Sequence, residues 1–329
     1  MLEAKSSRNP LTRAAIPPKV IANRLLQQHQ LASLRYALWL GHAQKDAKAT
    51  RNFAQQSGIP PVNIWETPIL PTPDGQVLFI LGSGSSINDL KPHHFAHIGN
   101  HQSIGVNFWY FHDFVPNVFS FDAGRADPGH KDLDKTLVKM GRLFDRKPIL
   151  ESRPKILYLR PLNSDRKQLM PVPRELAAHR WVSSRANLIS TNQPALESDL
   201  RLMLRKIATR SFPQTVLPDN GSSVVRMIFL GLARGYRDII LTGVDLDERP
   251  HFWYSQAYVS RYQEYTDLFP TPENAPHGTT QAINRPLGNQ EFLASLGKVM
   301  AEEGAGRLWV SSHDSRLEGS LPRYTWPSD

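Results

Sequence analysis

The sequence predicts an α/β protein with a Rossmann-like, mostly parallel sheet that carries helices on both faces. Short apolar runs recur along residues 77–311, and longer segments with helical periodicity fall between them. The first run, 77–81, breaks directly into a turn of glycine and serine, which is typical of a buried parallel strand. Strands are expected at 77–81, 102–106, 117–121, 155–159, 237–242 and 307–311. Helices are expected near 131–145, 196–209, 222–235 and 289–303.

Residues 1–75 predict a helical N-terminal extension and a proline-rich linker. Apolar residues form a broad stripe at helical spacing in 19–57, beside several lysines and arginines: Leu25, Leu26, Leu31, Leu34, Ala37, Leu38 and Leu40. Such a helix either packs on the main domain or lies on an anionic membrane surface. Five prolines in 58–75 exclude regular helix and mark the entry to the domain at 76–329.

Two stretches of that domain lack a clear helical or strand pattern. Residues 146–194 carry basic residues and several prolines, so we expect an irregular insert there. Residues from about 247 to 288 are expected to form a lid.

Composition excludes several classes of protein. The chain of 329 residues has no cysteine, which excludes disulfides and thiolate metal sites and fits a cytoplasmic protein. No apolar stretch approaches 20 residues, so no membrane span is expected, and the start lacks the apolar core of a secretory signal. The net charge of +9 favours phosphorylated substrates, polyanions or peripheral contact with an anionic inner membrane. No nucleic-acid-binding motif accompanies the charge, so nucleic acid is not an expected partner.

The turn after the first strand is a candidate anion site. Gly82, Ser83, Gly84 and Ser85 have little side chain to block a ligand, and their backbone N–H groups can point at a phosphate. A helix beginning at Ile87 would add the attraction of its dipole. The turn lacks the third glycine of a dinucleotide fingerprint and the Gly-Lys-Ser/Thr ending of a P-loop. A plain strand–helix connection is therefore the alternative.

Polar residues follow the other expected strands. Ligands of open parallel sheets gather at the carboxyl ends of the strands, which selects Asn107, Asp122 and Asp245. The Asn107 amide suits a base edge or a ribose hydroxyl, and Asp122 suits a ribose or an attacking hydroxyl. Ser222 and Ser223 begin an apolar helix and present hydroxyls with unpaired backbone N–H groups. For each of these residues, a structural turn or helix cap is the alternative.

Acidic and histidine residues offer further chemistry. Asp245 and Asp247 form a D-x-D pair that can hold a divalent cation on a diphosphate, provided that the strand persists past Gly243. His93, His94, His97 and His101 cluster at helical spacing; a surface cluster is favoured over zinc because no H-E-x-x-H pattern is present.

His277 lies in a proline-rich loop between two candidate binding elements. A loop histidine of this kind suits a general base near neutral pH.

In this order, the segments resemble the bacterial sialyltransferases of glycosyltransferase family 42, over roughly 77–312. The family opens with a strand and a G-N-G-P-S-L turn, similar to 82–87, and continues with N-Q-F-Y-F, similar to 107–111. A serine-led helix ending in Gly-Tyr and a strand ending in S-G-I-D follow, similar to 222–236 and 242–245. The family's lid histidine falls at His277.

The resemblance implies a function. The donor would be a CMP-activated acidic sugar, sialic acid or a related one, used without metal or other cofactor and with inversion at the anomeric carbon. His277 would be the base, and the 82–86 turn, Asn107, Ser222 and Ser223 would hold the nucleotide. The expected acceptor is a glycan in lipopolysaccharide or capsule biosynthesis, and the basic charge of the chain favours an anionic, lipid-linked one at the inner membrane. The oligomeric state is left open, with a homo-oligomer allowed.

Differences from the family keep two other functions open. Asp247 stands where the family has the first of two phosphate-stabilising tyrosines, and Tyr254 is the candidate for the second. One alternative is therefore a non-catalytic, sialyltransferase-like module that binds nucleotide. The other is a metal-dependent transferase that takes a UDP- or GDP-sugar through Asp245 and Asp247.

Overall fold

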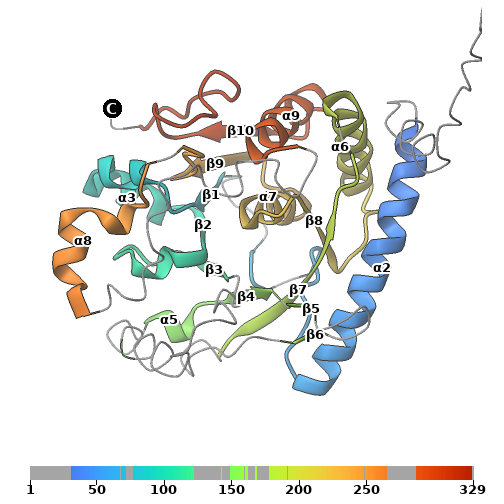
Figure 1. Ribbon diagram of the computed structural model, residues 1–329, viewed down its shortest axis with the longest axis horizontal. Coiled ribbons are helices and arrows are strands. Elements are labelled where there is room, and N and C mark those ends of the chain that lie inside the picture. The colour runs from blue at the N-terminus through green and yellow to red at the C-terminus, as the bar shows by residue number, and fades with distance from the viewer. Residues whose placement is uncertain are drawn as a thin grey trace, which may run out of the picture.

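The computed structural model describes residues 31–66, 68–71, 77–121, 142, 149–158, 160–161, 167–168, 178–190, 192–247, 249–264 and 287–327. In these residues, eight strands form one sheet in the order β10-β9-β1-β2-β3-β4-β7-β8 (Figure 1). Every neighbouring pair is parallel. The strands are β1 (Val77–Leu81), β2 (Gln102–Val106), β3 (Val118–Phe121), β4 (Lys155–Tyr158), β7 (Arg180–Asn187), β8 (Val216–Asp219), β9 (Asp238–Thr242) and β10 (Arg307–Val310). A separate antiparallel pair joins β5 (Arg160–Pro161) to β6 (Lys167–Gln168).

Helices cover both faces of the sheet (Figure 1). One face carries α2 (Ala32–Ser57), α6 (Gln193–Ala208), α7 (Ser223–Arg234) and α9 (Asn289–Glu302). The other carries α3 (Pro92–Gly99) and α8 (Gln256–Arg261), while the short α5 (Ile149–Ser152) lies near β4. The predicted fold class, a Rossmann-like parallel sheet with helices on both faces, is therefore confirmed. No helix in these residues has both the length and the apolar character needed to cross a membrane.

Alternating side chains of the strands build two different cores. Leu78 and Ile80 of β1 face an aliphatic core under α7 and α9, whereas Phe79 and Leu81 face a core rich in aromatic rings. All four side chains are fully buried, as expected for a strand with helices on both sides. The continuous apolar run of β1 in the sequence is the direct result of this two-sided burial.

The order of the strands creates a switch point between β1 and β9. The chain runs from β1 through β2, β3 and β4 to β7 and β8 in one direction, then returns to place β9 and β10 on the other side of β1. In sheets of this kind, ligands bind at the carboxyl edge where the direction reverses. The fold therefore points to the ends of β1 and β9 as the place for a site.

The six expected strands are present, and the sheet contains two that were not expected. The interpretation of 146–194 as an irregular insert is wrong for its C-terminal part, because 180–187 forms β7 between β4 and β8. This strand buries Ser183 and Ser184 rather than an apolar run, so it carries no hydrophobic signal. The edge strand β8 is four residues long and contains Pro218, a residue that predicts a turn and is tolerated at a sheet edge.

The expectations for helices near 196–209, 222–235 and 289–303 are confirmed by α6, α7 and α9. The start of α6 has a local cause: the Asn192 side chain accepts a hydrogen bond from the Ala195 N–H, and Pro194 occupies the first turn. The α7 helix ends at Gly235, whose φ of 93° places it in the left-handed region. The expected helix at 131–145 lies outside the described residues, apart from residue 142.

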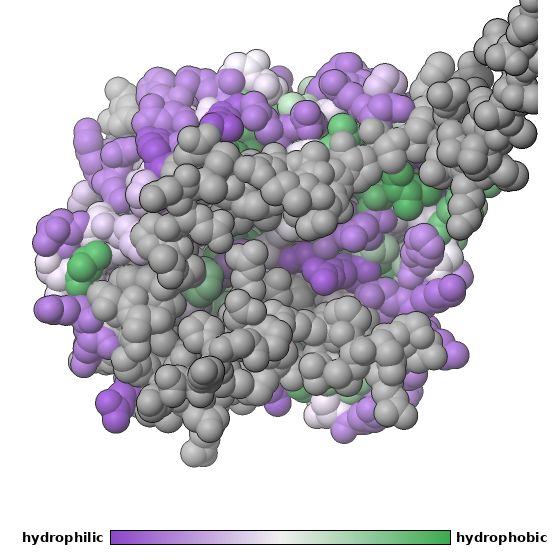
Figure 2. Space-filling view, viewed as in Figure 1, coloured by the Kyte–Doolittle hydropathy of each residue, from purple (hydrophilic) through white to green (hydrophobic). Residues whose placement is uncertain are grey.

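The N-terminal helix buries a different face from the one that the leucines predicted. Leu34 and Leu38 are 49% and 43% exposed, and hydrophobic residues are visible on the surface around the N-terminal end of α2 (Figure 2). The buried face instead carries Arg35, Trp39 and Ala43. Leu25 and Leu26 lie outside the described residues.

Arg35 turns toward the sheet because α6 supplies a buried partner. Its Nε lies 2.8 Å from Asp199 Oδ1, and its Nη2 donates to the Ala195 carbonyl at 3.1 Å. The Ser190 hydroxyl donates to the same carboxylate at 2.5 Å, and both charged side chains are at most 4% exposed. Next to it, the Trp39 indole donates to the Ala186 carbonyl of β7 at 3.1 Å. Polar bonds and small alanines thus fix α2 against the sheet.

The proline-rich linker also packs into this core. Val62, Ile64, Ile69 and Leu70 are at most 2% exposed. Val62 N–H donates to the Val182 carbonyl of β7 at 2.8 Å. The division of the chain at residue 75 stays a prediction.

The substitution Arg35→Met should lower the free energy of unfolding by about 3–5 kcal/mol, because it leaves the Asp199 carboxylate buried without its cation. Urea denaturation measures this change. Adding Asp199→Asn to Arg35→Met should recover part of the loss, since no uncompensated charge then remains. Arg205→Met, which breaks the exposed pair with Glu303, is the control and should change stability little. An equal loss in both single variants would contradict the role of the buried pair.

Candidate functional site

The candidate site lies where the ends of β1 and β9 meet. Leu81 of β1 pairs with Thr242 of β9, and the contact continues beyond both strands. Gly82 N–H donates to the Thr242 carbonyl and Gly84 N–H to the Gly243 carbonyl, each at 2.7 Å. The turn after β1 therefore lies against the segment after β9, at the switch point of the sheet.

The glycines of the turn are required by close approach. A Cβ atom on Gly82 would overlap the Gly243 carbonyl, and one on Gly84 would overlap the carboxylate of Asp245. Gly84 itself has an extended backbone with φ −66° and ψ 158°, so steric space, and not a left-handed conformation, explains this residue.

The carboxylate of Asp245 binds the turn after β1, where the sequence predicted a ligand anion. Its Oδ2 accepts a hydrogen bond from the Ser86 N–H at 2.9 Å, and its Oδ1 accepts one from the Ser86 hydroxyl at 2.5 Å. The carboxylate is nearly inaccessible, and burial raises the pKa of Asp245, while the bonds from Ser86 oppose that rise. The N–H groups of Gly84 and Ser86 thus bond to acceptors of the chain itself.

The helix dipole expected at Ile87 is also missing. Residues Ser85–Asp89 form a 3₁₀ turn, and the α-helix α3 begins only at Pro92. Pro92 fits the first turn of a helix, where its missing N–H has no partner to lose. The expectation of a strand–turn–helix phosphate cradle at 82–87 is therefore wrong in its helical part.

Asp247 does not join Asp245 in a metal site. The strand ends at Thr242, and the left-handed φ angles of Gly243 (68°) and Leu246 (56°) remove the alternation on which a D-x-D pair depends. Asp247 accepts hydrogen bonds from Arg249, from its N–H at 3.1 Å and from its Nε at 2.5 Å.

The guanidinium of Arg249 connects several acidic groups. It donates to Asp314 at 2.8 Å and lies 3.7 Å from Asp245. Donors therefore already surround both carboxylates of the D-x-D pair. The described residues contain no cluster of three potential metal-ligating side chains.

Asn107 and Ser223 are in contact although they lie 116 residues apart in the sequence. Asn107 follows β2 with a left-handed φ of 53°, which asparagine tolerates better than most residues. Its Oδ1 accepts a hydrogen bond from the Ser223 hydroxyl at 3.2 Å. Ser222 is the N-cap residue of α7, but its side chain makes no capping hydrogen bond. Two residues predicted to contact a nucleotide are thus in direct contact.

A buried ion pair lies behind this contact. Arg226 Nη2 donates to the Ser223 hydroxyl oxygen at 2.9 Å, and its Nη1 donates to Asp219 Oδ2 at 2.7 Å. Asp219 Oδ1 accepts the Ser222 N–H at 3.0 Å, so the pair also fixes the start of α7. Arg226 is 2% exposed and Asp219 is fully buried. The sequence offers Asp219 as a cap of this helix, which its bond from the Ser222 N–H confirms, but not as the partner of an arginine. Arg226 was not among the sequence-based candidates, because an arginine inside an apolar helix forms no local motif.

Ser83 contacts a second residue that the sequence candidates omitted, His251. His251 Nδ1 lies 3.1 Å from the Ser83 carbonyl and 3.2 Å from its hydroxyl. The carbonyl can only accept a hydrogen from Nδ1, whereas the hydroxyl can donate to Nδ1 or accept from it, so Ser83 can hold either tautomer of the His251 ring. Trp253 stacks on the imidazole at 4.4 Å between ring centroids. The only signal in the sequence was that His251 lies in the same short segment as Tyr254.

The remaining predicted residues have varied positions. The Ser85 hydroxyl is buried and has no partner among the described residues. Tyr254 ends the 3₁₀ turn Phe252–Tyr254, which packs against the 82–88 turn, and burial raises its pKa. Asp122, which follows β3, and His277 both lie outside the described residues, as do 265–286 of the expected lid.

Three of the four clustered histidines, His94, His97 and His101, pack against rings of the aromatic core, whereas His93 is exposed. His97 Nε2 lies 2.8 Å from the Tyr324 hydroxyl, and His94 stacks on Trp326 at 4.6 Å between ring centroids. His94 Nδ1 also accepts the Lys91 N–H at 3.0 Å, which fixes the start of α3. The surface cluster that the sequence favoured therefore holds for His93, while His94 is buried and His97 and His101 are partly buried.

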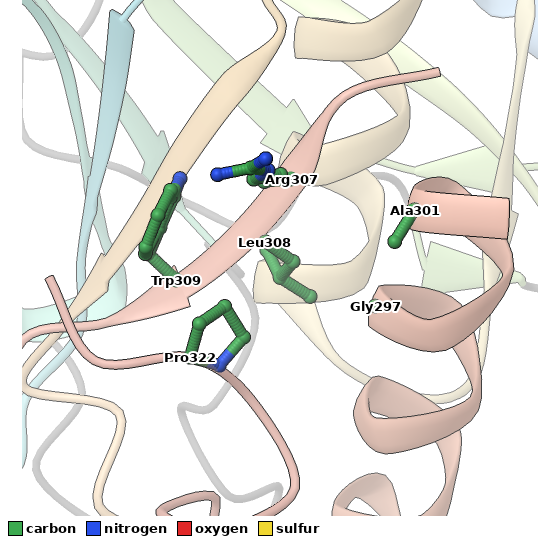
Figure 3. Close-up of a pocket in the computed structure, with 6 residues that line it drawn as sticks. All are labelled: Gly297, Ala301, Arg307, Leu308, Trp309 and Pro322. Atoms are coloured by element: carbon green, nitrogen blue, oxygen red, sulfur yellow. The ribbon is translucent and has the colours of Figure 1, made fainter. Parts of the chain in front are cut away.

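A small cavity lies elsewhere, between α9 and the edge strand β10 (Figure 3). Its volume is about 170 Å³, and its lining residues are Gly297, Ala301, Arg307, Leu308, Trp309 and Pro322. None of these residues belongs to the switch point. The cavity therefore does not change the position of the candidate site.

The substitution Gly84→Ala should destabilise the protein by about 1–3 kcal/mol, since the new methyl group displaces the Asp245 carboxylate. The matched control is Gly41→Ala in α2, where a Cβ meets nothing within 4 Å. This control should be stabilising by about 0.5–1 kcal/mol because alanine favours helix. Thermal unfolding compares the two. Equal effects would mean that the turn has no tight contact with Asp245.

The buried carboxylate should also give a distinctive pH dependence. Burial raises the pKa of Asp245 in the folded state above 3.8, so folding favours the protonated group. Its contribution to stability is then fully present below pH 3.8 and is lost as pH rises through the folded pKa. Urea unfolding at a series of pH values should show the stability of the wild type falling relative to Asp245→Asn over this range. A constant difference would contradict the raised pKa.

No protein-family model matches this chain, and no curated protein matches it in sequence. Among solved structures, the chain is similar to the crystal structure of a monofunctional alpha-2,3-sialyltransferase from Campylobacter jejuni. The TM-score is 0.39 and the identity is 12%, over 79% of this chain and 84% of that one.

Proposed function

We propose that this chain is an inverting glycosyltransferase that takes an acidic sugar, sialic acid or a related one, from a CMP-activated donor. The observation that carries the proposal is the convergence of residues at the switch point. Asp245, Ser83 and Asn107 follow the neighbouring strands β9, β1 and β2 at their carboxyl edge. Ser223, at the start of α7, reaches the same edge through its hydrogen bond to Asn107. The edge at a switch point is where sheets of this type bind nucleotides.

The proposed roles follow from the chemistry of each group. The amide of Asn107 and the hydroxyl-rich start of α7 would bind the nucleotide. Asp247 is neutralised by Arg249, so its charge would oppose the donor phosphate less than the sequence alone implied. His251, held by Ser83, adds an imidazole at the same edge.

The proposed reaction is a single displacement at the anomeric carbon. The acceptor hydroxyl gives its proton to His277 as its oxygen bonds to that carbon, and the bond to the CMP oxygen breaks. The electron pair leaves with the phosphate, whose negative charge requires neutralisation. His277 lies outside the described residues, so its role rests on its place in the proline-rich loop and on the sequence resemblance. The basic charge of the chain favours an anionic, lipid-linked glycan acceptor at the inner membrane.

A second function, binding of a nucleotide without transfer, is favoured by one observation. The Asp245 carboxylate bonds to both donors of Ser86 in the turn expected to hold phosphate. A donor phosphate at this turn would meet a buried carboxylate in place of unpaired N–H groups. A metal-dependent transferase is less well supported, because donors surround Asp245 and Asp247.

The test is release of CMP from CMP-sialic acid or CMP-Kdo in the presence of glycan acceptors. We expect release by the wild type, loss of release in His277→Ala, and unchanged release in the presence of EDTA. His313→Ala is the matched control, because that side chain is 61% exposed and lies outside the candidate site; its activity should be retained.

Other outcomes separate the alternatives. Binding of CMP by calorimetry without turnover would support the non-catalytic module. Loss of activity in EDTA would support the metal-dependent transferase. Absence of both CMP binding and CMP release would overturn the proposal and the second candidate together.

A further inference from the structure

The hydrogen bonds that lead from Arg226 through Ser223 to Asn107 have a fixed order of donor and acceptor. Arg226 carries only donors, so the Ser223 hydroxyl oxygen must accept the hydrogen from Nη2 at 2.9 Å. The single hydroxyl hydrogen of Ser223 is then directed at Asn107 Oδ1, at 3.2 Å. The direction begins with the charge of Asp219, which holds the other arm of the guanidinium at 2.7 Å.

This direction fixes which end of the Asn107 amide faces the site. Because Oδ1 is turned inward as the acceptor of Ser223, the two hydrogens of Nδ2 remain for contacts on the other side. Burial makes the arrangement hard to reverse: Ser223 is 7% exposed and Arg226 2%. Asn107 itself is only partly buried, so a ligand can reach it.

We propose that the buried Asp219–Arg226 pair, acting through Ser223, makes Asn107 an obligatory hydrogen-bond donor to the ligand of the candidate site. Arg226 and Asp219 are positioning residues, and Asn107 is the residue that contacts the ligand. The matching group on the ligand is a hydrogen-bond acceptor, either on a pyrimidine base or among the ribose and phosphate oxygens. That the ligand is a nucleotide rests on the proposed function. The direction of the hydrogen bonds rests on the contacts of Arg226, Ser223 and Asn107.

The substitution Asn107→Asp tests the direction with almost no change of shape. Aspartate also tolerates a left-handed φ, and its inner oxygen still accepts from Ser223, so the melting temperature should shift by no more than about 1 °C. Its outer oxygen can only accept, so the affinity for CMP should fall about 10–100-fold. Asn100→Asp adds the same charge at an exposed position outside the site and should leave CMP affinity unchanged.

Further variants test whether the hydrogen bonds from Asp219 through Arg226 and Ser223, here called the relay, act as a unit. Ser223→Ala should weaken CMP binding about 2–10-fold because Asn107 loses the contact that orients it, and Ser223→Thr should restore most of the affinity. Arg226→Lys keeps the charge but cannot reach Asp219 and Ser223 with separate donor arms. Its effect on CMP affinity should not add to that of Ser223→Ala, since both break the same relay.

The source of the acceptor follows from smaller probes. If Asn107→Asp weakens cytidine but not ribose 5-phosphate, the acceptor is on the base; the reverse result places it on the sugar or phosphate. Unchanged CMP affinity in Asn107→Asp would overturn the inference. A loss of several degrees in its melting temperature, measured without ligand, would also overturn it, because the inner group of Asn107 would then be a donor. If the wild type binds none of the probes while Asn107→Asp keeps its melting temperature, the result would instead count against the proposed nucleotide function.

Discussion

The contact between Asp245 and Ser86 holds the centre of this molecule together. It joins the segment after β9 to the turn after β1, two regions that are 159 residues apart in the sequence. Gly84 leaves the space that the carboxylate fills, and the 3₁₀ turn Ser85–Asp89 carries the serine that binds it. Because the N–H and the hydroxyl of Ser86 bind the two oxygens of one carboxylate, they fix the orientation of the two segments as well as their distance.

The fold was predictable wherever a segment is buried on both sides by apolar contacts. The runs at 77–81 and 237–242 carry that signal, and both form central strands. The signal is absent in β7, whose buried serines lie between β4 and β8, and in the four-residue β8 at the edge. The orientation of α2 could not be predicted from the sequence either, because Asp199, the buried partner of Arg35, lies 164 residues away on α6.

The candidate site was also predictable only in part. Residues next to strand ends, such as Asn107 and Asp245, could be chosen in advance because the topology of a parallel sheet gathers them at one edge. Their partners could not. Whether Asp245 faces a phosphate, a metal ion or Ser86 depends on a few ångströms of backbone after Gly243, where left-handed residues interrupt the strand. The contact of His251 with Ser83 spans 168 residues and follows from tertiary packing alone.

The order of strands also has a consequence for synthesis on the ribosome. In the finished sheet β1 lies between β9 and β2, yet β9 is made after every other strand of the sheet except β10. Until residues 238–242 have emerged, β1 is an edge strand with an apolar side chain at every position and unpaired backbone groups along one side. A nascent chain of this topology depends on rapid completion or on chaperones to avoid pairing with other chains. The strand order that places the site between β1 and β9 therefore also delays its assembly until residues 238–242 have been made.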